Sequence, residues 1–222
     1  MNLTLFDLDG TLLPTDSDHA FGEFMVRVGW ADGERFRASN DAFYAAYTAG
    51  TLDLAAYVDF ATAAWRDRPL EEALAMRERF MREAMAPVLH DAALGLVRAH
   101  AAAGDQVAIV TATNEFVTRP IAQAFGVPHL IAVELERDAA GRVTGAVRGV
   151  PSFREGKVRR VHDWLAQLGQ TWEDFERVSF YSDSTNDRPL LERCSDPVAT
   201  NPSAELEAIA RERGWRILRL FE

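Results

Sequence analysis

The chain has 222 residues, of which 48% are hydrophobic, so it is long enough for one large domain or for one domain with a second inserted into it. Its formal net charge of −10 argues against nucleic acid as a partner, and its single cysteine, Cys194, excludes an internal disulfide and a multi-cysteine metal site. Only Met1 and Asn2 precede the first apolar run, and no stretch reaches the ~18–20 apolar residues of a membrane span, so we expect a cytoplasmic protein that does not bind membranes.

The first predicted element is a buried strand over residues 3–8, and Asp7 and Asp9 lie at its end, followed by Gly10-Thr11. A buried parallel strand is apolar on both faces, so two carboxylates are expected at its carboxyl end, where open α/β sheets bind their ligands. Paired carboxylates there favour a hard cation with oxygen ligands, Mg²⁺ first. A turn in which Asp7 and Asp9 cap backbone groups is the alternative.

The next predicted unit is all-helical and covers residues 16–86. Apolar side chains recur at helical spacing in four runs, within residues 20–28, 36–47, 54–65 and 70–85. Glycines and one proline separate the runs. Four helices without a strand predict a compact domain inserted after the first strand. We expect Trp65 and the stripe of Phe and Tyr side chains to form its core, with a cage around the substrate as the alternative; the stripe includes Phe36, Phe43, Tyr44, Tyr47 and Tyr57.

From residue 87 the predicted strands and helices alternate. Helices are expected over about 91–103, 114–126, 158–168 and after Ser203; strands are expected over 107–111, 129–135, 178–182, 197–200 and 215–220, with 142–147 as the return strand of a hairpin. This alternation predicts an α/β fold with a doubly wound parallel sheet. The sheet domain would comprise residues 1–15 and 87–222.

Polar groups recur where these elements meet. Thr111 ends a predicted strand, Lys157 begins a helix, and Asp183 and Asp187 follow another strand. Taken alone, Lys157 could be a solvated helix lysine, Thr111 a strand-end hydroxyl, Asp183 a turn residue and Asp187 a helix N-cap before Arg188-Pro189. Their joint occurrence after the first acidic pair favours one site.

In order and spacing these groups resemble the four motifs of the haloacid dehalogenase-like hydrolases. Asp7-Leu8-Asp9-Gly10-Thr11, Thr111, Lys157 and Asp183-Ser184-Thr185-Asn186-Asp187 are similar to the first, second, third and fourth motif. The helical insert and Gly156-Lys157 resemble the phosphoserine phosphatase-like branch (subclass IB). The resemblance implies a Rossmann-like core with an inserted all-helical cap.

The resemblance also implies a Mg²⁺-dependent phosphomonoesterase that works through an aspartyl-phosphate intermediate. Asp7 would be the nucleophile, which splits a resistant hydrolysis into two displacements. Asp9 would be the general acid and base, a role that needs a raised pKa. Asp7, Asp183 and the backbone carbonyl of Asp9 would be the metal ligands.

The other motif residues would bind or support the phosphoryl group. Thr111, the backbone N–H of Ala112 and Lys157 would contact it directly, with Lys157 supplying a point charge. Asn186 and Asp187 would not contact the phosphoryl group themselves but would position waters or Lys157. Cys194 has no neighbour in sequence that would activate it and is expected to be inert.

Substrate choice is predicted from the insert. Phosphoserine phosphatases bind the substrate ammonium with an acidic residue nine positions after the nucleophile; here that position is Asp16, with Asp18 nearby, although either could instead cap a helix. Ala61 occupies the approximate position of the arginine that binds the substrate carboxylate. This favours a small cationic phosphorylated metabolite without a carboxylate, histidinol phosphate first, and hence a role in amino-acid biosynthesis.

Three alternatives remain open from the sequence. Phosphoserine phosphatase is the second choice of activity. A phosphotransferase or mutase would share the aspartyl-phosphate, and a non-catalytic phosphate-binding regulator would share the fold class. Oligomeric state is not indicated.

Overall fold

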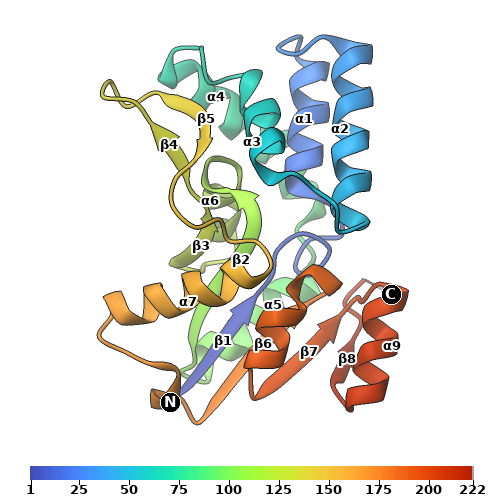
Figure 1. The fold of residues 1–222 in the computed structure, drawn as a ribbon, viewed down its shortest axis with the longest axis vertical. Helices are drawn as coiled ribbons and strands as arrows, with labels where there is room; N and C mark the ends of the chain where they lie inside the picture. The colour runs from blue at the N-terminus through green and yellow to red at the C-terminus, as the bar shows by residue number, and fades with distance from the viewer. Residues whose placement is uncertain (222) are drawn as a thin grey trace.

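The computed structural model describes residues 1–221, and its centre is a sheet of six parallel strands. The strand order is β3-β2-β1-β6-β7-β8 (Figure 1). The strands are β1 (Asn2–Phe6), β2 (Gln106–Asn114), β3 (His129–Val133), β6 (Arg177–Ser182), β7 (Asp196–Thr200) and β8 (Arg216–Leu218). The Rossmann-like α/β fold expected from the sequence is confirmed.

Helices cover both faces of this sheet because β1 is apolar on both. Phe6 packs in one core with Val97, while Leu3 and Leu5 pack in a second core with Val161. The first core includes residues of α5 (Asp91–Ala102) and α6 (Glu115–Ala124); the second includes residues of α7 (Glu155–Gln167), α8 (Arg188–Arg193) and α9 (Ala204–Arg213). Short turns η3 (Trp172–Asp174) and η4 (Thr185–Asp187) flank β6.

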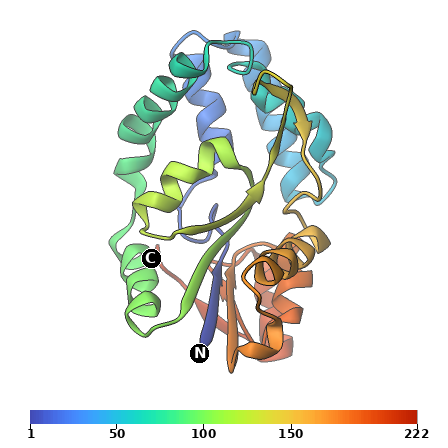
Figure 2. The same ribbon diagram turned by 90° about the vertical axis from the view of Figure 1, so that its left-hand side faces the viewer.

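Four helices lie beyond the carboxyl ends of the strands, as Figures 1 and 2 show. They are α1 (Ser17–Arg27), α2 (Gly33–Thr48), α3 (Leu54–Ala63) and α4 (Leu70–Phe80), and a π-helical turn η1 (Met81–Met85) and a 3₁₀ turn η2 (Ala86–Val88) lead back to α5. Phe21 and Phe24 of α1 pack edge-on against Phe80. We propose that residues 16–86 form a domain of their own, with 1–15 and 87–222 as the sheet domain.

The hairpin of β4 (Leu135–Arg137) and β5 (Val143–Val147) lies beside α3 rather than beside the sheet (Figure 1). The expected single strand over residues 129–135 is therefore wrong: it divides at Glu134 into β3, which joins the sheet, and β4, which joins the hairpin. Glu134 forms ion pairs with Arg148 and Arg160, and this places a charged cluster where the chain leaves the sheet. The part of the structure beyond the carboxyl ends of the sheet strands therefore contains this hairpin as well as helices.

A second difference concerns β2, which was expected to end at Thr111. The strand continues to Asn114, and its register against β3 shifts between Val110 and Asn114. The predicted end of this strand at Thr111 is therefore wrong. The extension brings three further residues of this strand to the edge of the sheet that faces the helices.

No helix among residues 1–221 is long and apolar enough to cross a bilayer.

Candidate active site

The loop after β1 brings its carboxylates into contact with the end of β6. The backbone N–H of Asp7 donates to the carbonyl oxygen of Tyr181 at 2.9 Å. Gly10 has a φ of 76°, and a Cβ atom at this position would lie 2.4 Å from Oδ2 of Asp183. Only glycine accommodates both the backbone conformation and the carboxylate. The tight turn therefore allows Asp183 to approach Asp7.

Lys157 lies at the centre of the site with its ammonium group buried. Its Nζ donates to Oδ1 of Asp7 at 2.7 Å and to Asp187 at 2.7 Å, and its side chain is 1% exposed. Burial alone would lower the pKa of Lys157, but the carboxylates of Asp187 and Asp7 outweigh it and raise that pKa. Lys157 therefore stays charged. It is the only lysine in the sequence.

Asp187 supports Lys157 rather than capping a helix. Although it precedes α8, its side chain makes no cap hydrogen bond; it accepts instead from Lys157 and from Oγ of Ser182 at 2.8 Å. Burial raises the pKa of Asp187 to about 6 against the opposing charge of Lys157. The helix-cap alternative for this residue is wrong, because a buried ammonium is the stronger partner.

The carboxylates of Asp7 and Asp183 face each other across one hydroxyl group. Oγ1 of Thr11 lies 3.3 Å from Oδ2 of Asp7 and 3.0 Å from Oδ1 of Asp183. Burial, and next the charge of Asp7, hold the pKa of Asp183 well above its ordinary value. Two carboxylates this close together offer the oxygen ligands that a hard divalent ion such as Mg²⁺ prefers.

Within residues 1–221 no group of three or more His, Cys, Asp and Glu side chains is arranged to hold a metal ion. A metal at this place would therefore have two carboxylate ligands, Asp7 and Asp183. The backbone carbonyl of Asp9 is the third protein ligand that the sequence predicts. Mg²⁺ often keeps several waters and uses one or two protein carboxylates, so such a set suits it.

Asp9 is held from two sides. The backbone N–H of Ser17 donates to its Oδ1 at 2.7 Å, and Oγ1 of Thr113 donates to its Oδ2 at 2.8 Å. Burial, and next the negative charge of Asp16, raise the pKa of Asp9 to about 7. A carboxyl group with this pKa can hold and release a proton near neutral pH.

Thr111 is buried beside these groups, and its Oγ1 accepts a hydrogen bond from the backbone N–H of Thr113 at 3.1 Å. This leaves the Thr111 hydroxyl proton free to be donated. Thr111, Ala112 and Thr113 all line the pocket that contains Asp7 and Asp9. The sequence analysis did not identify Thr113 as a site residue. The only local indication was that Thr113 follows Thr111 by two positions, so that both hydroxyl groups lie on the same face of the strand.

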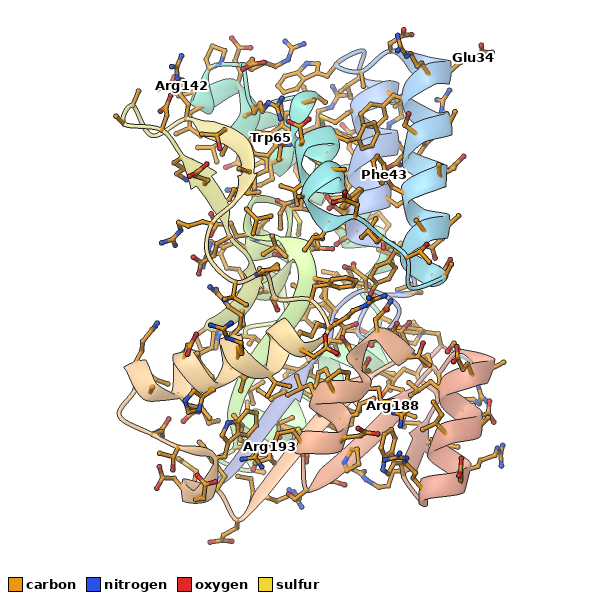
Figure 3. The ribbon with its side chains drawn as sticks, in the orientation of Figure 1. Glu34, Phe43, Trp65, Arg142, Arg188 and Arg193 are labelled. Carbon is orange, nitrogen blue, oxygen red and sulfur yellow. The ribbon has the colours of Figure 1, made fainter. Side chains whose placement is uncertain are left out.

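Aromatic side chains of the helices line the same pocket. Phe43, Tyr44, Tyr47 and Tyr57 face it together with Leu52 and Leu54. Figure 3 places Phe43 between α2 and α3, whereas Trp65 lies at the far end of α3, where its ring stacks on Phe116. The expectation of a structural core holds for Trp65 and in part for Phe43 and Tyr57, which pack against each other, with Phe43 also against Phe60. The expectation did not include the pocket that Phe43, Tyr44, Tyr47 and Tyr57 also line, since helical spacing does not distinguish a core from a pocket wall.

Two acidic residues at the start of α1 complete the wall of the pocket. Asp16 caps α1 by accepting from the backbone N–H of His19 at 2.8 Å, yet it also lines the pocket, and burial raises its pKa to about 6. Asp18 accepts from Nδ2 of Asn114 at 3.2 Å and from Tyr57, and burial raises its pKa to about 7. Asp16 therefore both caps α1 and lines the pocket.

One further contact joins the helices to the sheet domain near Lys157. Arg154 has a φ of 51°, donates to the carbonyl oxygen of Gly50, and reaches Oδ1 of Asn186 at 3.4 Å. Nδ2 of Asn186 donates to the carbonyl oxygen of Tyr47 at 3.0 Å. Arg154 and Asn186 thus connect the end of α2 to the start of α7. Sequence reasoning missed Arg154.

Comparison with known proteins places this geometry in context. Residues 4–192 match the model of the haloacid dehalogenase-like hydrolase family. A protein named histidinol-phosphatase from Neisseria meningitidis serogroup C (strain 8013) is 42% identical over 217 residues, covering 98% of each chain. A phosphoserine phosphatase from Mycobacterium tuberculosis (strain ATCC 25618 / H37Rv) is 31% identical over 96% of this chain and 68% of that protein.

Two solved structures share the fold of this chain at different levels of sequence identity. A protein of unknown function from Bordetella pertussis Tohama I is 48% identical, with a TM-score of 0.94 over 99% of each chain. A substrate-bound phosphoserine phosphatase complex is 16% identical, with a TM-score of 0.68 over 97% of this chain and 91% of that one. At this low identity the second match shows a shared fold.

Proposed function

Because the chain belongs to the haloacid dehalogenase-like hydrolase family and is a phosphoric monoester hydrolase, we propose that it hydrolyses histidinol phosphate through a phosphorylated Asp7, with Mg²⁺ as its cofactor. The observation that carries the substrate assignment is the acidic, aromatic-lined pocket beside Asp9. Hydrolysis of this substrate would give the chain a cytoplasmic role in amino-acid biosynthesis.

In the first step a carboxylate oxygen of Asp7 attacks phosphorus and the ester oxygen leaves. Lys157, 2.7 Å from Oδ1 of Asp7, offsets the charge of the dianionic phosphoryl group as it approaches. Asp9 donates its proton to the leaving alcohol oxygen, for which its pKa of about 7 is suited. Thr111 donates its hydroxyl proton to a phosphoryl oxygen.

In the second step water displaces Asp7 from phosphorus. Asp9, now ionised, takes a proton from the attacking water, and inorganic phosphate leaves with Asp7 restored. Mg²⁺ bound by Asp7, Asp183 and the Asp9 carbonyl would supply positive charge to the phosphoryl oxygens. Asp187 and Ser182 keep Lys157 in place through both steps.

The charge distribution supports a cationic substrate. Asp7, Asp9, Asp16 and Asp18 all line the pocket, and its lining residues include His19 but no arginine or lysine. An ammonium or imidazolium group beside Asp16 and the tyrosine rings would form ionic and cation–π contacts. A substrate carboxylate would meet no arginine there, so phosphoserine, the named substrate type of one relative, is the second candidate.

Phosphate release tests this proposal. With Mg²⁺ present, kcat/KM should be higher for histidinol phosphate than for phosphoserine and p-nitrophenyl phosphate, and Asp7→Asn should abolish turnover of all three. Asp16→Asn should lower kcat/KM about tenfold or more for histidinol phosphate, because a charged hydrogen bond contributes about 1.5–3 kcal/mol. An equal loss on p-nitrophenyl phosphate would remove Asp16 from substrate recognition, and full activity of Asp7→Asn would refute the mechanism.

A further inference from the structure

Hydrogen bonds from Ser17 and Thr113 join the Asp9 carboxyl to two different parts of the molecule. Ser17, whose N–H donates to Oδ1, is the first residue of α1. Thr113, whose hydroxyl donates to Oδ2, lies in β2 of the central sheet. With Ser17 alone, rotation about the last side-chain bond of an aspartate is only weakly restricted. The Thr113 bond supplies the second fixed point and sets the plane of the carboxyl group.

Thr113 is itself held firmly. Its side chain is buried, with 6% of the residue exposed, and its backbone N–H donates to Oγ1 of Thr111 at 3.1 Å. Thr111 is the hydroxyl that contacts the phosphoryl group in the proposed mechanism. Thr113 therefore links Thr111, which would bind the phosphoryl group, to Asp9. Because Thr111 and Thr113 belong to one strand, the distance between the two hydroxyl groups is fixed.

We propose that Thr113 is a positioning residue that directs the Asp9 carboxyl at the leaving-group oxygen. The inference rests on the proposed function, in which Asp9 protonates that oxygen. Proton transfer requires heavy atoms about 2.6–3.2 Å apart, so a rotated carboxyl loses its contribution even when Asp9 is present. Thr113 contacts neither phosphorus nor the leaving group in this role.

The test compares substrates that differ in their need for an acid. A variant that loses only the hydroxyl, Thr113→Val, is assayed with histidinol phosphate, whose alkoxide needs protonation, and with p-nitrophenyl phosphate, whose leaving group departs without it. The parameter is kcat/KM, since it covers only the steps up to formation of phosphorylated Asp7. Thr113→Ser, which keeps the hydroxyl, is the rescue variant. Thr62→Val is the matched control, because the Thr62 hydroxyl is buried in α3 and donates to the carbonyl oxygen of Val58.

We expect Thr113→Val to lower kcat/KM for histidinol phosphate about tenfold or more, within the 10²–10⁴-fold typical of general acid catalysis, and for p-nitrophenyl phosphate less than about threefold. Thr113→Ser and Thr62→Val should stay near wild type on both substrates. In Asp9→Asn, adding Thr113→Val should cause little further loss on histidinol phosphate, because the acid that Thr113 directs is already absent.

Equal losses of Thr113→Val on the two substrates, or full additivity with Asp9→Asn, would overturn the inference. Thermal unfolding of each variant verifies that it folds, and Thr113→Ala replaces Thr113→Val if the latter does not. These outcomes differ from a failure of the proposed function, in which the wild-type protein itself would release no phosphate from histidinol phosphate. In that case ethanolamine phosphate serves as the alkyl substrate for the same comparison.

Discussion

Replacement of Lys157 by methionine isolates the electrostatic role of the buried ammonium group. Methionine has a similar length and no charge, so Lys157→Met removes two ion pairs while filling most of the space. Without the cation, the carboxylates of Asp7 and Asp187, 3% and 2% exposed, lose their shared partner. We expect this variant to be folded and markedly less stable than wild type.

The size of the loss follows from the two contacts of 2.7 Å. At an effective dielectric constant of 20, each corresponds to about 6 kcal/mol of Coulomb energy, from which the cost of burying the ammonium must be subtracted. Breaking a buried ion pair typically costs about 3–5 kcal/mol, and we expect a loss of that size. For a chain of this length the melting temperature should fall by roughly 6–20 °C.

The loss should also depend on pH. Burial raises the pKa values of Asp7 and Asp187, the latter to about 6, and Lys157 opposes both shifts, so both pKa values should rise further in Lys157→Met. A carboxyl group whose folded pKa exceeds its ordinary value of 3.8 destabilises the fold fully above the folded pKa. This effect decreases as the pH falls below the folded pKa and is absent only below the ordinary value. The stability deficit of Lys157→Met should therefore be larger at pH 8 than at pH 5.

Urea unfolding at pH 5 and pH 8, without added divalent ions, measures this deficit. The matched control is Arg159→Met, because Arg159 is exposed on the same helix and its replacement should change stability by less than about 0.5 kcal/mol. A deficit for Lys157→Met below about 1 kcal/mol at pH 8, or one that is equal at both pH values, would refute the reasoning.

Two further predictions concern the same region. Since Lys157 is the only lysine, reductive methylation of the folded protein should modify the N-terminus alone, and intact mass spectrometry should detect a second modified amine only after unfolding; rapid modification of both amines would contradict the burial of Lys157. Arg154→Ala and Arg154→Gly should both raise KM, because each removes the contacts to Gly50 and Asn186. Of these two variants, Arg154→Gly should be the more stable by about 1 kcal/mol, because φ is 51° at this residue and glycine adopts such a value without strain. Equal stability of the two variants would argue against backbone strain at this position.

Residue pattern was sufficient to predict the parts of the site that depend on chain topology. Asp7 and Asp183 each follow a buried strand, and strands β1 and β6 pair in parallel, so their carboxyl ends have to meet at one edge. Lys157 could be assigned because its place at a helix start completes the order of the four motifs. The sheet follows for the same reason, since alternating strands and helices have few ways to bury their apolar faces.

Neighbours across the helix–sheet boundary could not be predicted in this way. The hydroxyl of Thr113 reaches Asp9 only because β2 continues beyond Thr111, and the pocket-facing tyrosines differ from core aromatics only in what lies opposite them. Sequence periodicity reports which side of an element is buried, whereas the partner on that side depends on the packing of distant segments. The order of the strands' polar ends, and with it the meeting of Asp7, Lys157 and Asp183, could therefore be predicted from the sequence. The full length of β2, the contacts that hold Asp9 and the residues that line the pocket were decided by the tertiary structure.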